Sequence, residues 1–331
     1  MRFSVFVSLL SLLVLFSCKQ VSEKENSQLE MQAVITMMES DIERLERKIM
    51  DLGTYTISLF EKREEVLRNA DKNRFTFEGF YANSAPNANL DLSTIYLSEL
   101  AKDRGKAEEL ILLTNSLDQK FKEILLEFPM VTQIYFNSPL QVNRLYPPFD
   151  IKTMFEPNLD VKEFNFYYEA DESHNPSGGL VWLDEIYVDP VGKGWMISLL
   201  NPVYFEGNLQ MVFGFDITVN DIITFYIDKT SRQLLVMDAT GTVVAGKARA
   251  IEMLSLPPLK NHTYTQTITS DSFRMDDFNL FKSKNQEVRK MASQIILAGQ
   301  NSYHLQLGSE SFDVRVQKMK KLNWYVIDMG L

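Results

Sequence analysis

Apolar residues recur at alternating three- and four-residue spacings along one stretch near the N-terminus. This seam consists of Ile35, Met38, Ile42, Leu45, Ile49, Leu52 and Leu59. Charged residues such as Glu43 and Arg47 fill the intervening positions, a pattern typical of an amphipathic α-helix. We predict a long spine helix over residues 31–70. The seam also suits a coiled-coil homodimer, but Gly53 and Thr56 interrupt it before a fourth clean heptad, which favours packing on its own domain.

Beyond this helix the pattern predicts two α+β units. In the first, residues 71–218, an Asn- and Pro-rich loop at 81–94 precedes a helical region at 93–126, and alternation predicts strands at 131–136, 181–188, 194–200 and 210–217. In the second, residues 219–331, we predict helices at 219–228 and 283–298 and strands at 234–237, 242–245, 302–307, 312–317 and 324–329. The expected fold class is α+β, with an antiparallel sheet in each unit.

The first residues have the layout of a secretory signal. An apolar run from Phe3 to Phe16 follows Arg2 and is too short to span a bilayer comfortably. We predict a signal peptide at residues 1–17 and a flexible tether of charged and small residues at 18–30. A plain cleaved signal and an uncleaved anchor remain alternatives.

Cys18 is the single cysteine of the chain and directly follows this run. The ending Ser17-Cys18 resembles a bacterial lipobox, which implies a diacylglycerol on the Cys18 sulfur and a membrane-anchored, extracytoplasmic protein. Cys18 cannot form a disulfide within the chain, because a disulfide needs a second cysteine. Lys19 does not resemble an inner-membrane retention residue, so the resemblance favours the outer membrane.

Composition and motifs argue against several functions. With 44 acidic and 34 basic residues the net charge is −10, which repels nucleic acid. The three histidines are far apart in sequence and have no companion cysteine cluster, so we predict neither a metal site nor a cofactor. The run Gly241–Lys247 matches most of a phosphate-binding loop, but Ala248 replaces its hydroxyl and its β-branched residues favour a strand. We find no nucleophile with its base and predict no enzyme.

Several short segments appear in the order of a known sensor module. They are Tyr135-Phe136-Asn137-Ser138, Arg144-Leu145-Tyr146-Pro147, Asn165-Phe166-Tyr167, residues 182–187, Trp195-Met196-Ile197-Ser198, Asn201-Pro202-Val203-Tyr204, Gly214-Phe215-Asp216-Ile217 and residues 235–241. Together they resemble the double Cache family over approximately residues 32–331. The resemblance implies two PAS-like units after a long helix, an extracytoplasmic location, and a small metabolite in the first unit.

Amino-acid-binding members of that family carry an Arg-x-Trp-Tyr element, a later Tyr and an Asp. By resemblance, the Tyr-Tyr-Asp part corresponds to Tyr167, Tyr187 and Asp216. Phe164 stands at the arginine position and Phe166 at the tryptophan position. Because the arginine that would grip a carboxylate is missing, an amine, a purine-like ring or another metabolite fits as well as an amino acid.

Strand alternation supports Asp216 independently, since it places Gly214 and Asp216 on one face. Gly214 is expected to leave open space there for a ligand cation enclosed by aromatic rings. The predicted ligand-binding residues are Asp216, Tyr187, Tyr167, Trp182, Phe166, Tyr135 and Arg144. The alternatives are that Asp216 caps a helix starting near Val219 and that the aromatic residues are core.

These observations predict a lipid-anchored extracytoplasmic sensor of a small metabolite that lacks its own output domain. It would signal through a membrane-bound partner, and the helix could also support a homodimer. The alternatives are a nutrient-binding protein that serves a transporter and a scaffold or adhesin lipoprotein with a degenerate pocket.

Overall fold

The computed structural model describes residues 2–84, 87–189, 194–257 and 275–330, with side chains from Asn26 onward. The described chain forms two compact units. The larger unit contains residues 41–222, and the smaller unit contains residues 2–40, 223–257 and 275–330. The two units divide after Ile222, close to the boundary expected at Thr218.

Helix α1 (Arg2–Glu61) contributes its first part to the smaller unit and the rest to the larger unit, and α2 (Arg63–Asn69) follows it. All seven seam residues are buried within the chain. The backbone at 18–30, where we predicted a flexible tether, is helical. The stretch contains neither Gly nor Pro to stop a helix. The predicted lipidation site, the Cys18 side chain, lies outside the described side chains.

The larger unit contains an eight-stranded antiparallel sheet in the order β1-β2-β3-β5-β4-β8-β7-β6. Its strands are β1 (Phe77–Glu78), β2 (Tyr81–Ala82), β3 (Thr94–Leu97), β4 (Gln133–Asn137), β5 (Val142–Tyr146), β6 (Val181–Val188), β7 (Trp195–Phe205) and β8 (Asn208–Thr218). Strand β3 begins where we predicted a helix, because Thr94-Ile95-Tyr96 are β-branched and aromatic residues that pair with β5. The remainder of that predicted helix is two helices, α3 (Arg104–Leu113) and α4 (Leu117–Glu127).

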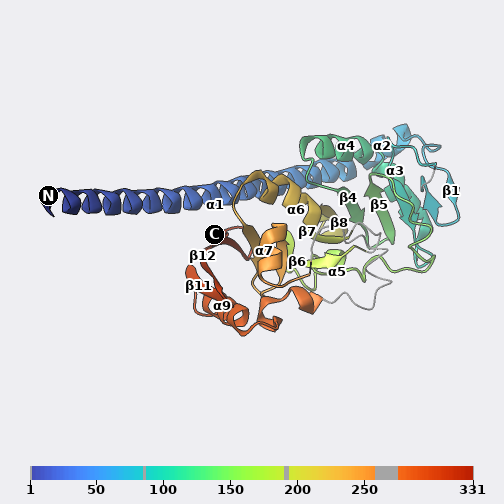
Figure 1. Cartoon of the computed structure of the whole chain (residues 1–331). Helices are drawn as coiled ribbons and strands as arrows, with labels where there is room; N and C mark the ends of the chain where they lie inside the picture. The colour runs from blue at the N-terminus through green and yellow to red at the C-terminus, as the bar shows by residue number, and fades with distance from the viewer. Residues whose placement is uncertain (1, 85–86, 190–193, 258–274, 331) are drawn as a thin grey trace. The chain divides into compact units, whose positions relative to one another are not determined.

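Different elements cover the two faces of this sheet. Figure 1 shows α1, α3 and α4 on one side and α5 (Asn165–Tyr168) on the other. On the helix face, Asn201 Nδ2 donates to the Ile49 carbonyl of α1, and the Phe121 ring of α4 meets Phe213 edge-on. The opposite face is covered by residues 147–180, which we call the covering segment. Any site on that face therefore lies beneath the covering segment.

The smaller unit contains a five-stranded antiparallel sheet in the order β10-β9-β13-β12-β11. Its strands are β9 (Leu234–Asp238), β10 (Val243–Gly246), β11 (Ser302–Leu307), β12 (Glu310–Lys318) and β13 (Trp324–Gly330). Its helices are α7 (Ala248–Met253) and α9 (Gln286–Ile296), with 3₁₀ turns at Ile227–Lys229, Met275–Phe278 and Leu280–Lys282, and α6 (Val219–Phe225) leads into it. The run that resembled a phosphate-binding loop is mostly strand β10, as its β-branched residues predicted. The predicted architecture, a long helix followed by two α+β units with antiparallel sheets, is confirmed.

Candidate ligand-binding site

Asp216 lies on β8 with its side chain under the covering segment, and it is 1% exposed. Strand pairing places Gln133 of β4 opposite it on one side and Ser198 of β7 on the other. Directly paired residues of neighbouring strands project from the same face. The sheet therefore delivers three polar side chains to one point beneath the covering segment.

Hydrogen bonds join these side chains and Tyr187 into a network around the Asp216 carboxylate. Ser198 Oγ donates to Oδ1 at 2.5 Å, and Gln133 Nε2 donates to Oδ2 at 2.7 Å. The Tyr187 hydroxyl lies 2.6 Å from Ser198 Oγ and 3.5 Å from Oδ1. All of these partners are neutral groups.

Burial raises the pKa of Asp216 from its ordinary 3.8 to about 7, although its hydrogen bonds with Ser198 and Gln133 lower it in part. Within the described part of the chain, no lysine, arginine or histidine forms an ion pair with this carboxylate. Burial also raises the pKa of the Tyr187 hydroxyl, and the nearby Asp216 charge adds to that shift. The site is therefore poor in positive charge.

The open space expected beside Gly214 is not present, because the Tyr135 ring occupies it. Tyr135 pairs with Gly214 across β4 and β8. A Cβ atom added at Gly214 would lie only 2.1 Å from the ring. Gly214 is thus needed for the close approach of Tyr135 and does not leave a void.

Aromatic side chains of the covering segment complete the cluster. The Phe166 ring lies 5.2 Å from Tyr135, 6.0 Å from Tyr187 and 4.6 Å from Phe164, measured between centroids. Tyr167 is buried in the same cluster. The structure therefore brings together five of the seven predicted residues: Asp216, Tyr187, Tyr167, Phe166 and Tyr135.

Trp182 is not brought to this cluster. Its indole Nε1 donates to Glu46 Oε1 of α1 at 3.1 Å, on the helix face of the sheet. Trp182 and Tyr187 are five positions apart on β6, and an odd separation reverses the face of a regular strand.

Arg144 also lies on the helix face, fully buried. Its guanidinium donates to Asp118 Oδ1 of α4 at 2.6 Å and to the Ile111 carbonyl of α3 at 2.9 Å. Asp118 additionally accepts hydrogen bonds from Arg74 and Ser93. The arginine therefore ties β5 to the helices and is unavailable to a ligand on the other face.

The alternative role for Asp216 as a helix cap is wrong. Thr218 and Asp221 cap α6 reciprocally, with Asp221 N donating to Thr218 Oγ1 and Thr218 N donating to Asp221 Oδ2. Asp216 instead bonds to Ser198 and Gln133.

The sequence analysis did not name Gln133 and Ser198 as site residues. Ser198 lies two positions after Met196 on β7, so alternation alone would have put both on one face. Alternation alone would also have put Gln133 on the face of Tyr135, two positions away on β4, but its place beside Asp216 follows only from the pairing of β4 with β8. Because sequence patterns do not fix which strands become neighbours, this signal needed the structure.

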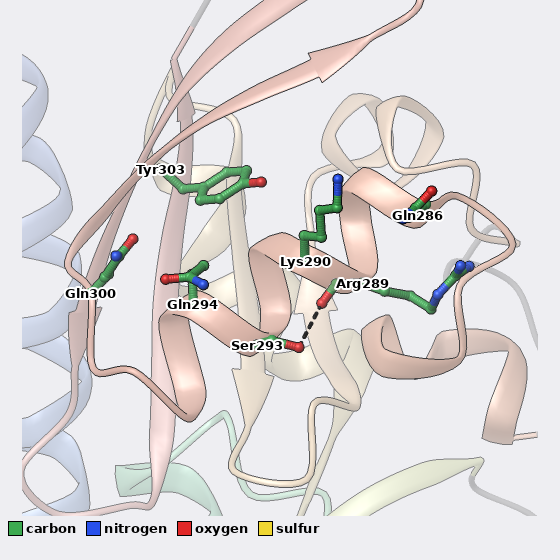
Figure 2. Close-up of a pocket in the computed structure, with 7 residues that line it drawn as sticks. All are labelled: Gln286, Arg289, Lys290, Ser293, Gln294, Gln300 and Tyr303. Atoms are coloured by element: carbon green, nitrogen blue, oxygen red, sulfur yellow. Dashed lines mark hydrogen bonds between the residues drawn. The ribbon is translucent and has the colours of Figure 1, made fainter.

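A surface hollow lies in the smaller unit, along α9 and the start of β11 (Figure 2). It is a wide surface groove of about 550 Å³. Its lining residues are Gln286, Arg289, Lys290, Ser293, Gln294, Gln300 and Tyr303. Arg289 is held by the Ser283 and Lys284 carbonyls, and Lys290 pairs with Glu287 at 2.8 Å. Since both cations already have partners, this groove is the weaker candidate.

Among the described residues, no three His, Cys, Asp or Glu side chains gather as a metal ion would require. None of the described helical segments is both apolar enough and long enough to pass through a bilayer.

No protein-family model and no curated protein matches the chain. Solved structures of chemoreceptor ligand-binding domains are similar to it. CtaA of Pseudomonas fluorescens with L-serine is 13% identical, with a TM-score of 0.43, over 64% of this chain and 79% of that one. PctB of Pseudomonas aeruginosa PAO1 with L-Gln is 13% identical, with a TM-score of 0.44, over 70% and 78%. Tlp3 of Campylobacter jejuni with L-norvaline is 14% identical, with a TM-score of 0.41, over 91% and 92%.

Proposed function

We propose that this protein is an extracytoplasmic sensor whose larger unit binds a small molecule through an amino group at Asp216. The observation that carries the proposal is a fully buried carboxylate with only neutral partners among the described residues. A carboxylate without a cation is costly to bury. An ammonium group beside it would supply the missing charge.

The surrounding rings suit a cation. Phe166 and Tyr187 stack on one another near Asp216, and the faces of aromatic rings attract ammonium groups. A ligand ammonium would thus meet a negative oxygen on one side and electron-rich rings on the other. This combination favours a cation over a neutral or anionic ligand.

The same site offers little to a carboxylate. Arg144 is bound to Asp118 on the other face of the sheet, and Lys162 is an exposed residue 3.7 Å from Asp160. Phe164 occupies the position at which the resemblance expected an arginine. We therefore place amines that lack a carboxylate ahead of amino acids as ligands.

Signalling in this proposal follows from the tight packing of the site. Since Tyr135 and the covering segment fill the space over Gly214, an amine can enter only if these side chains rearrange. A ligand shifts such an equilibrium by its preference for the rearranged state. A membrane-bound partner would read that change, with the protein held at the membrane, and preferentially the outer one, through a lipid on Cys18.

Two alternatives belong to the same proposal. A nutrient-binding protein would use the same site to deliver an amine to a transporter. The filled space over Gly214 specifically favours the other alternative, a scaffold or adhesin with a degenerate pocket. Ligand binding separates the scaffold from both binding functions.

Thermal-shift measurements against amines, organic acids and purines test the proposal. We expect amines to raise the melting temperature of the wild-type protein and to have no effect on Asp216→Asn. Asp276→Asn, which changes an exposed carboxylate in the smaller unit, is the matched control and should respond as the wild type does. If millimolar amines leave the melting temperature of the folded wild-type protein unchanged, the scaffold function is favoured over the sensor function.

A further inference from the structure

Two buried oxygen atoms beside Asp216 have no hydrogen-bond partner. They are the hydroxyl oxygen of Tyr135 and Oε1 of Gln133, both on β4. Tyr135 is 2% exposed, and Gln133 is also buried. Buried polar atoms are nearly always paired in native proteins. Two unpaired oxygens in one cluster therefore point to a missing donor.

Both oxygens lie around the same carboxylate. The Gln133 amide already donates its Nε2 to Asp216 Oδ2 at 2.7 Å, which leaves Oε1 of the same small group to accept. Burial raises the pKa of the Tyr135 hydroxyl, and the Asp216 charge adds to that shift, so the hydroxyl faces the carboxylate. Gln133 Oε1 and the ionised carboxylate can only accept, and the Tyr135 oxygen can accept as well as donate, so a group with several donors could bond to all three.

We propose that Tyr135 and Gln133 complete, with Asp216, a three-oxygen site that selects a primary ammonium group. This inference rests on the proposed function and adds to it the class of amine. A primary ammonium carries three N–H donors, which matches the three oxygens. Each N-methyl group removes one donor and leaves one buried oxygen unpaired.

Packing adds a steric reason for the same selectivity. The Tyr135 ring lies against Gly214 so closely that a single Cβ atom there would collide with it. Phe166 packs edge-on against the same ring, 5.2 Å between centroids. The ring must already shift to admit a primary ammonium, and a methylated nitrogen would require a larger shift against the same contacts.

Calorimetric titration of the intact folded protein with n-butylamine, N-methylbutylamine, N,N-dimethylbutylamine and butyltrimethylammonium tests the inference. We expect the affinity to fall with each methyl group, by about ten- to a hundredfold for the first, which corresponds to the loss of one charged hydrogen bond. Tyr135→Phe keeps the ring and removes the oxygen. It should therefore weaken the binding of n-butylamine and reduce the ratio of its affinity to that of N-methylbutylamine. Tyr55→Phe, which loses a hydroxyl bonded to Ser116 on the helix face, is the matched control and should leave the series unchanged.

The outcomes separate this inference from the function on which it rests. If butyltrimethylammonium binds the wild-type protein as tightly as n-butylamine, the three-oxygen site is wrong while amine sensing stands. If Tyr135→Phe weakens all four amines equally, the hydroxyl does not select among them and the inference is again wrong. If none of the four binds the wild-type protein, both proposals fail. The wild-type series needs no variant, so a poorly folding Tyr135→Phe would not prevent the test.

Discussion

Asp216 is held in a position that, in the proposed function, suits a charged ligand better than it suits the unliganded protein. Its carboxylate is buried, its partners Ser198 and Gln133 are neutral, and burial raises its pKa to about 7. Above that pH the folded protein must keep a buried negative charge without a described counter-ion. Such a charge lowers stability, and functional sites commonly carry this kind of cost.

The first prediction concerns Asp216→Asn and the pH dependence of stability. Between pH about 4 and about 7 the folded protein keeps the Asp216 proton that the unfolded chain has released. Stability therefore falls as the pH rises through that window, and the penalty is complete above it. The Asn variant lacks this titration, so its free energy of unfolding should exceed that of the wild type at pH 8, by on the order of a few kcal/mol.

Urea unfolding at pH 4, 6 and 8 measures this difference. The gap between variant and wild type should be small at pH 4 and grow with pH. A constant gap at all three values would contradict the account. The Gln133 amide can rotate to present Oε1 to the new Asn amide, so the substitution need not leave a buried donor unpaired.

At the residue scale the sequence predicted part of the candidate site. Alternation along β8 correctly gave Asp216 and Gly214 a shared face, and the resemblance supplied Tyr187, Phe166 and Tyr167. Trp182 was misplaced even though its odd separation from Tyr187 already argued for the opposite face. The position of Arg144 could not be read from the sequence, because its partner Asp118 comes from a helix whose packing no local pattern specifies.

Among the elements, the periodic apolar seam of α1 is compatible with two kinds of packing, a spine within one chain and a coiled coil between two chains. Its buried stripe packs within the chain, as Leu45 and Ile49 do at 0% exposure. The spine interpretation is therefore the one observed. A homodimer would have to use another surface of this helix.

We predict that Leu45→Ala lowers the free energy of unfolding by about 2–5 kcal/mol, the cost of a cavity in a packed core. The oligomeric state should not change, because the residue packs inside its own unit. Urea unfolding and light scattering after gel filtration measure the two quantities, with the exposed Arg47→Ala as control. Loss of a dimer without loss of monomer stability would instead favour the coiled coil.

The covering segment is the element that a ligand entering the proposed site would have to move. Tyr81 and Tyr96 tie it to the sheet through hydrogen bonds to the carbonyls of Phe155 and Glu156. Its only α-helix in the described chain is α5, held by few backbone bonds, such as Tyr167 N to the Phe164 carbonyl. Short elements of this kind open at low free-energy cost.

We therefore predict slower amide hydrogen exchange at residues 164–170 when n-butylamine is bound. The ligand would hold the aromatic side chains around itself and make local opening rarer. Hydrogen exchange measured by mass spectrometry, with α9 of the smaller unit as internal reference, tests this. An amine that binds while exchange at 164–170 stays unchanged would place the ligand elsewhere.

The elements were more predictable than the site. Most strands after Pro129 were predicted within a few residues, because alternation and turn residues mark their ends. Strand β3 was mistaken for a helix and β5 was not predicted, since both are short and are stabilised by pairing with their neighbours in the sheet. Strand order is a tertiary property, which explains why Gln133 was missed.

At the scale of the whole molecule, a net charge of −10 favours the approach of cationic ligands over anionic ones. The net negative charge of the molecule and the negative charge of the buried Asp216 carboxylate thus both favour a cationic ligand. The proposed lipid on Cys18 would hold the protein at the membrane surface, where a partner could read its state.

We predict that Cys18→Ser abolishes incorporation of labelled palmitate in a bacterial host and moves the protein from the membrane fraction to the soluble fraction. The sulfur is the atom that would carry the diacylglycerol, and serine cannot replace it in that reaction. Fractionation and lipid labelling measure the change, with Ser22→Ala as the neighbouring control. If the wild-type protein incorporates no label, the proposed lipid anchor on Cys18 is wrong.

A crystal structure of the larger and smaller units together, grown with a bound primary amine, tests the central claim most directly. The account predicts the amine nitrogen at ~3 Å from the Asp216 carboxylate, with Tyr135 and Gln133 as its other partners. An amine bound on the helix face near Trp182, in the α9 groove, or anywhere that leaves Asp216 without a cation would contradict it.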